Sequence, residues 1–154
     1  MASAPPSDVR RRAVVLLSDG EDTHSLVSFD DVLDLARRSG VAIYTVALES
    51  SIDRLLSPRG VTEGRFAMRG LAEATGARAF FPAGLGDIRG VYDAIAAELR
   101  SQYSIGYLPR NAVGDGAWRR VAVQVTARPG SSARARPGYF ASPGLAALAA
   151  LLKR

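Results

Sequence analysis

The sequence predicts an α/β fold in which a parallel sheet lies between two layers of helices. Continuous apolar runs without alternation are typical of strands that are covered on both faces, and amphipathic helical patterns recur between them. This repetition favours right-handed crossovers and a three-layer architecture. The last third of the chain alternates apolar and smaller residues, which predicts a C-terminal antiparallel hairpin. The length, 154 residues, suits one domain.

The composition divides the chain into four segments. Residues 1–12 are small, polar and proline-containing, so a disordered lead-in is expected there. The remaining segments are an α/β domain over 13–102, a hairpin extension over 103–141 and a short apolar helix over 142–154. That last helix is too short to span a membrane and is expected to dock on a core or on another chain.

The first strand and helix have clear boundaries. Residues 13–17 form an apolar run, AVVLL, which predicts a strand covered on both faces. Ser28 is predicted to cap a helix, because Asp31 stands at the reciprocal position three residues later. We expect Asp34 to face Arg38 at four-residue spacing within this helix.

The same order of elements is then repeated. Predicted in turn are a strand over 41–48, a loop over 50–64, a helix over 66–75, a strand over 77–81 and a helix that starts at Asp87. Further on, the alternating segments 103–107 and 121–125 are predicted to pair as a hairpin around the loop at 109–117. Segment 134–140 is a weaker strand candidate, because Pro137 interrupts it.

The composition excludes many enzyme chemistries. The chain has no cysteine and one histidine, His24, so disulfides, Cys/His zinc sites, iron–sulfur clusters and thiol nucleophiles are ruled out. No glycine-rich phosphate loop is present. An aspartyl-nucleophile phosphohydrolase normally carries two aspartates two residues apart, whereas Asp19 and Asp22 are three apart. We therefore expect a protein that is not an enzyme.

The net charge of +5 comes almost wholly from arginine, since Lys153 is the single lysine. Such a charge suits nucleic acid, but the arginines are scattered rather than arranged in a stripe, so no nucleic-acid partner is predicted. Neither a signal peptide nor a membrane span is expected, because no apolar run has the required length.

Three acidic residues directly follow the first predicted strand: Asp19, Glu21 and Asp22. The carboxyl ends of parallel strands form the ligand-binding edge of an open sheet. A carboxylate at Asp19, held by a tight turn at Gly20, suits Mg²⁺ or Mn²⁺, and Asp22 is a weaker candidate ligand. The alternative is that this stretch is only a turn with an Asx-type cap.

Several segments together resemble a von Willebrand factor type A (vWA) domain. Residues 13–23, AVVLLSDGEDT, resemble the fourth strand and following loop of that family, and residues 41–47, VAIYTVA, resemble the fifth strand. LAEATG at 71–76, followed by AFF at 79–81, is similar to the next helix and strand. The resemblance covers residues 12–141. ELRSQYSIGY at 98–107 and PGYF at 137–140 are similar to a bacterial vWA-related subgroup.

The resemblance implies a Rossmann-like fold with a metal-ion-dependent adhesion site, in which magnesium or manganese bridges to an acidic residue of a protein partner. In the family, an Asp-x-Ser-x-Ser motif, a threonine and an aspartate of the fourth-strand loop hold the metal, and Asp19 matches that aspartate. No Asp-x-Ser-x-Ser occurs in this sequence. The resemblance therefore covers the C-terminal half of the domain and implies an incomplete site.

A sheet without the family's first strand would leave residues 13–17 as an unpaired apolar edge. Three interpretations follow: a truncated sequence, a split protein completed by a partner, or a domain that self-associates through this edge. The predicted function is that of a protein-binding, adhesion-type module. The alternatives are a metal-independent self-association module and, less favoured, a metal-dependent phosphohydrolase using Asp19 or Asp22. Relatives of the subgroup suggest an exported or cell-surface protein.

Overall fold

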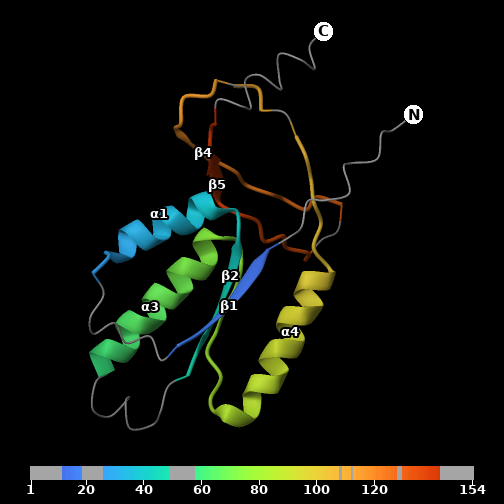
Figure 1. Ribbon diagram of the computed structural model, residues 1–154. Helices are drawn as coiled ribbons and strands as arrows, with labels where there is room; N and C mark the ends of the chain where they lie inside the picture. The colour runs from blue at the N-terminus through green and yellow to red at the C-terminus, as the bar shows by residue number, and fades with distance from the viewer. Residues whose placement is uncertain are drawn as a thin grey trace.

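A computed structural model describes residues 12–18, 26–48, 58–107, 109–111, 113–127 and 130–142. The fold is α/β, as predicted: a three-stranded parallel sheet with helices, followed by a two-stranded antiparallel sheet (Figure 1). The predicted lead-in, up to residue 11, and the predicted helix over 142–154, from residue 143 onward, lie outside the described residues.

The parallel sheet has the strand order β1-β2-β3. Its strands are β1 (Ala13–Ser18), β2 (Ala42–Ala47) and β3 (Ala79–Phe80). β1 runs in register with β2 over its whole length, and β3 joins the other side of β2 through two residues. β2 is therefore the central strand, and β1 is an edge of the described sheet.

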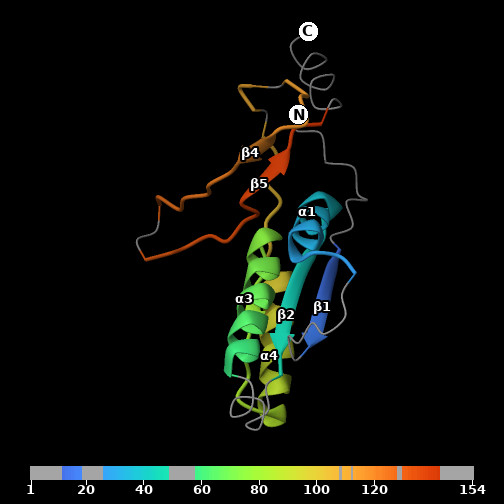
Figure 2. The ribbon, with the colours of Figure 1, turned by 90° about the vertical axis from the view of Figure 1, so that its left-hand side faces the viewer.

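Helices lie on both faces of this sheet. α1 (Phe29–Ser39) and α3 (Pro58–Ala74) lie on one face, and α4 (Ile88–Arg100) lies on the other (Figures 1 and 2). The side chains of β2 alternate accordingly. Thr45 donates a hydrogen bond from Oγ1 to the Met68 carbonyl of α3 at 2.9 Å, whereas Tyr44 and Val46 pack with Ile95 of α4 in the main core.

α1 begins after the predicted cap. Ser28 accepts a hydrogen bond from the Asp31 amide at 3.2 Å and donates its hydroxyl to the Asp31 carboxylate at 2.6 Å. The predicted pairing of Asp34 with Arg38 is wrong, since Asp34 pairs with Arg37 at 3.2 Å. The Arg38 guanidinium instead lies 3.8 Å from the centre of the Phe140 ring, a cation–π contact.

α3 starts earlier than predicted. The structure continues the helix back to Pro58, so the expected loop at 50–64 is wrong over its last seven positions, 58–64. Proline suits the first turn of a helix, where its missing N–H leaves no bond unmade. The helix ends at Ala74, and Gly76 follows with φ of +76°. A side chain at Gly76 would place its Cβ 2.8 Å from the Arg136 backbone nitrogen.

The second sheet corrects the predicted hairpin. The strands that pair are β4 (Trp118–Arg120) and β5 (Gly138–Phe140), not 103–107 and 121–125. Pro137 is accommodated because it lies just before β5, where its carbonyl accepts a hydrogen bond from the Val121 amide at 2.9 Å.

Aromatic packing explains the choice of strands in this sheet. The Trp118 and Phe140 rings meet edge to face with centroids 4.8 Å apart. The Trp118 ring lies so close to Gly138 that a Cβ there would be 2.6 Å from it. In contrast, the Tyr103 side chain is 91% exposed, so the alternation at 103–107 produces no packed face.

Candidate functional site

The most distinctive feature of the described residues is the outer edge of β1. Two hydrogen bonds show which backbone groups of β1 face β2: the Ala42 amide donates to the Arg12 carbonyl at 3.1 Å, and the Leu48 amide donates to the Ser18 carbonyl at 3.0 Å. Backbone groups of successive residues point to opposite sides of a strand. The even-numbered residues of β1 therefore direct their N–H and C=O groups toward β2.

The odd-numbered residues of β1 direct their backbone groups away from the sheet. These residues are Ala13, Val15 and Leu17. No described strand lies on this side of β1, and Figure 2 shows β1 at the margin of the described elements. The edge therefore offers a row of N–H donors and C=O acceptors spaced for a β-strand.

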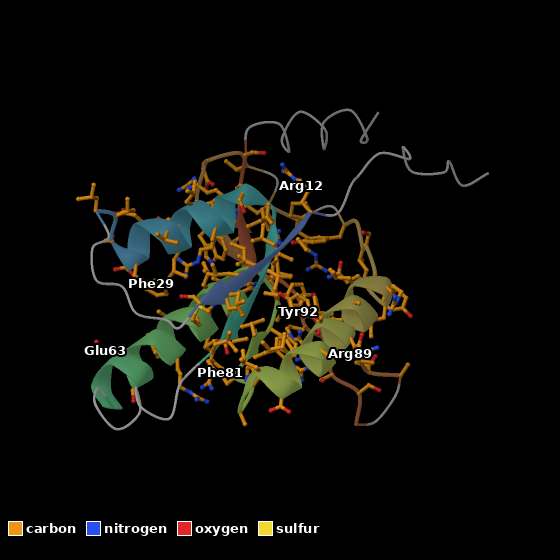
Figure 3. All side chains as sticks on the ribbon, turned by 60° about the horizontal axis from the view of Figure 1, so that its bottom comes forward. Arg12, Phe29, Glu63, Phe81, Arg89 and Tyr92 are labelled. Atoms are coloured by element: carbon orange, nitrogen blue, oxygen red, sulfur yellow. The ribbon has the colours of Figure 1, made fainter. Side chains whose placement is uncertain are left out.

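The side chains along this edge are apolar and exposed. Val14 is 49% exposed, Leu16 37% and Leu17 47%. The prediction that residues 13–17 are covered on both faces is therefore wrong. The side chains of a strand are covered partly by those of the strands on either side of it, and among the described residues β1 has a strand on one side only. Figure 3 shows the strand from another side, with Arg12 at its start.

Nothing on β1 protects its edge from pairing. Natural edge strands carry charged residues, prolines or bulges that oppose the addition of another strand. The sequence of β1, AVVLLS, has no charge and no proline, and its register with β2 is unbroken. Its six residues are long enough to bind a partner strand, whereas β3 at the opposite edge has two.

The residues predicted to bind metal, Asp19 and Asp22, lie outside the described residues, as do Glu21 and His24. The strand before them is described, and it ends at Ser18 beside Ala47. This is the carboxyl end of the parallel sheet, the end predicted for the ligand-binding edge. Within the part of the chain that the structure describes, no three His, Asp or Glu side chains lie together as a metal would require.

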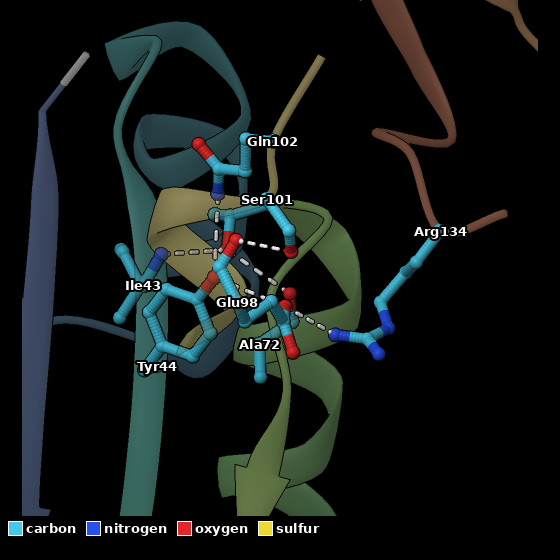
Figure 4. Close-up of polar contacts among 8 residues, drawn as sticks. Ile43, Tyr44, Ala72, Glu98, Ser101, Gln102 and Arg134 are labelled. Carbon is cyan, nitrogen blue, oxygen red and sulfur yellow. Dashed lines mark hydrogen bonds and ion pairs between the residues drawn. The ribbon is translucent and has the colours of Figure 1, made fainter. Parts of the chain in front are cut away.

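A polar cluster that the sequence did not predict joins β2, α4 and the segment before β5 (Figure 4). The Tyr44 hydroxyl donates to Glu98 Oε1 at 3.0 Å, and Gln102 Nε2 donates to the Tyr44 hydroxyl at 3.4 Å. Arg134 pairs with the same Glu98 oxygen at 2.5 Å. Burial, together with the Glu98 carboxylate, raises the pKa of Tyr44. The cluster holds distant segments together, and no sequence motif marks it.

A second ion pair supports the start of β4. Arg119 Nη2 donates to both carboxylate oxygens of Asp115, at 2.9 and 2.8 Å. This pairing, helped by the Ala117 amide, lowers the pKa of the Asp115 carboxyl group. The pair lies within one loop-and-strand segment, and we assign it a structural role.

Several arginines contact aromatic rings. The Arg65 guanidinium lies 4.2 Å from the centre of the Phe81 ring, and that of Arg78 lies 5.4 Å from the Phe80 ring. With Arg38 on Phe140, these contacts use the planar guanidinium for packing.

No helix among the described residues combines the length and the apolar character needed to cross a membrane.

Comparison with known proteins adds little. No protein-family model matches the chain, and no curated protein matches it. Among solved structures, it is similar to an uncharacterized membrane-spanning protein from Vibrio fischeri, with 22% identity and a TM-score of 0.47. The match covers 60% of this chain and 48% of that one, so the chain spans about half of that structure. A likeness at this level assigns neither a fold family nor a function.

Proposed function

We propose that this chain is a non-enzymatic, vWA-like protein-binding module that binds its partner at the free edge of β1. In this proposal, an apolar β-strand of the partner adds to the sheet beside β1. The observation that carries it is the outward direction of the backbone groups of Ala13, Val15 and Leu17, flanked by exposed apolar side chains. Such an edge is the surface that strand addition uses.

The backbone groups and the apolar side chains of the edge both contribute to binding. Each new backbone hydrogen bond is worth about 1 kcal/mol net. Burying the exposed part of Val14, Leu16 or Leu17 adds roughly 1 kcal/mol for each side chain. These gains offset the loss of translational and rotational freedom, which costs at least about 4 kcal/mol. Affinity therefore depends on every bond of the edge, and the loss of one is measurable.

The test uses a fluorescent synthetic peptide that carries the β1 residues, AVVLLS, between flanking lysines. Ala13→Pro removes one outward N–H and keeps the pairing with β2, while Ala13→Ser keeps the N–H and serves as the matched control. We expect the peptide to bind the wild type and Ala13→Ser alike, and Ala13→Pro about tenfold more weakly, as expected for about 1.4 kcal/mol. No binding to the wild type, or equal binding to both variants, would contradict the proposal.

A second candidate function is binding through a divalent cation, Mg²⁺ or Mn²⁺, that bridges Asp19 to an acidic residue of the partner. It is favoured by the position of Ser18, which ends β1 at the carboxyl edge of the sheet and directly precedes Asp19. A Mn²⁺ titration should show saturable binding of the ion by the wild type and by Asp30→Ala, and no binding by Asp19→Ala. Flat curves for all three proteins would remove this candidate. EDTA separates the two functions, because strand addition does not need the cation.

A further inference from the structure

We infer that the strand bound by β1 is β1 of a second copy of this chain, paired antiparallel about a two-fold axis that passes beside Val15. This inference rests on the proposed function, since it names the partner of the same edge. The dimer would carry one continuous sheet, with three strands from each copy in the order β3-β2-β1-β1-β2-β3.

The backbone of β1 is self-complementary in this register. In an antiparallel pair, two opposed residues whose backbone groups face each other exchange both hydrogen bonds. The outward-facing residues are spaced symmetrically about Val15, so Ala13 opposes Leu17 of the second copy and Val15 opposes itself. All outward N–H and C=O groups of both edges are thereby paired at once. A shift of register by two residues would leave some of them without a partner.

The side chains also match. Leu16 is in register with Thr45, whose hydroxyl contacts α3, so Val14 and Leu16 lie on the side of the sheet that carries α3. A two-fold axis perpendicular to the sheet keeps this side the same in both copies. Val14 then opposes Leu16 of the second copy at a non-hydrogen-bonded position, where Cα atoms lie about 4.5 Å apart. Both are exposed in the single chain and would be buried in the dimer.

Charge and topology favour a closed dimer over other assemblies. β1 carries no charged residue, so two copies of it meet without like-charge repulsion despite the net charge of +5. Pairing consumes the β1 edge of each copy. The edges that remain are the two β3 strands, each of two residues, which are too short to continue the sheet. The isologous contact therefore closes on itself.

The first measurement is sedimentation velocity of the whole chain over a range of concentrations. We expect a monomer–dimer equilibrium for the wild type and for Ala13→Ser. For Ala13→Pro we expect a dimer dissociation constant at least tenfold higher. Circular dichroism controls for folding, because the Ala13 N–H takes no part in the pairing with β2.

The second measurement tests the register with cysteines, which the chain lacks. We expect Val14→Cys mixed with Leu16→Cys to form a disulfide-linked dimer under mild oxidation, because the opposed Cα atoms lie within the 4.4–6.8 Å that a disulfide requires. Each variant alone should cross-link poorly. Two copies of position 14 are offset by two residues, which places their Cα atoms about 8 Å apart.

The outcomes separate this inference from the proposed function. A chain that stays monomeric at every concentration but binds the β1 peptide overturns the dimer and leaves the binding edge. A dimer that Ala13→Pro does not weaken overturns the β1 dimer, because it would form through another surface, and the peptide assay then tests the proposed function separately. Cross-linking of a single variant with itself, in preference to the mixture, overturns the antiparallel register.

Discussion

β1 and β2 are neighbouring strands of equal length and similar apolar content, yet they differ in burial. Tyr44 and Val46 of β2 are fully buried, whereas Val14 and Leu17 of β1 are about half exposed. The two strands pair in register, so the difference does not come from their own backbone. It comes from their neighbours, since in the described part of the chain β2 has a strand on each side and β1 has one. The buried contacts of these two strands are therefore concentrated in β2, and the exposed apolar surface is concentrated in β1.

The largest expected effect compares one substitution in both strands. Val46→Ala opens space in the main core and should lower the free energy of unfolding by about 2 kcal/mol. Val14→Ala removes the same atoms from an exposed position and should cost about 0.5 kcal/mol or less. Guanidinium unfolding of the two variants in dilute, monomeric protein measures the difference. Equal losses would mean that β1 is as well covered as β2, and would contradict a free edge at β1.

The sequence predicted the elements better than their surroundings. The cap at Ser28 and the apolar runs of both strands are local signals, and they placed α1, β1 and β2 correctly. Whether an apolar run lies at the centre or the edge of a sheet depends on distant segments, so the expected coverage of β1 was wrong. The unpaired edge itself was expected from the resemblance to a domain whose first strand is missing.

The errors in the second sheet have the same origin. The alternation at 103–107 suggested a strand, but pairing was decided by the fit of Gly138 beneath the Trp118 ring, which lies twenty positions away. Which residues of β1 direct their backbone groups away from β2, the odd-numbered or the even-numbered ones, was likewise not predictable. It depends on the register with β2, which the bonds to Arg12 and Ser18 reveal. The residues of the expected metal site, Asp19 and Asp22, lie outside the described residues and stay a prediction.

A smaller change in the free energy of unfolding is expected from the polar contacts of β2, the neighbour of the uncharged β1. Tyr44→Phe removes the hydrogen bond to Glu98 and should lower the free energy of unfolding by about 1 kcal/mol at neutral pH. Burial raises the pKa of Tyr44 in the folded chain. The unfolded chain therefore loses this proton first as the pH rises, and stability is retained below the ordinary tyrosine pKa of 10.0 but falls above it.

The measurement is denaturant unfolding between pH 8 and roughly 11, a window set by the ordinary tyrosine pKa. The fall above the ordinary tyrosine value should be smaller in Tyr44→Phe than in the wild type. Leu16→Ala is the matched control in β1, which contains no titratable side chain, and it should leave the pH dependence unchanged. An identical alkaline fall in the wild type and Tyr44→Phe would exclude Tyr44 as its source.

Residue-resolved amide hydrogen exchange along β1 tests the free edge most directly. In dilute, monomeric protein, the amides of Val14 and Leu16 donate to β2 and should exchange slowly, while those of Val15 and Leu17 should exchange fast. Saturation with the β1 peptide, or concentration to the dimer, should slow the second pair at least tenfold. Slow exchange of Val15 and Leu17 in the dilute chain, or fast exchange in the saturated one, would contradict an edge that is open and binds a strand.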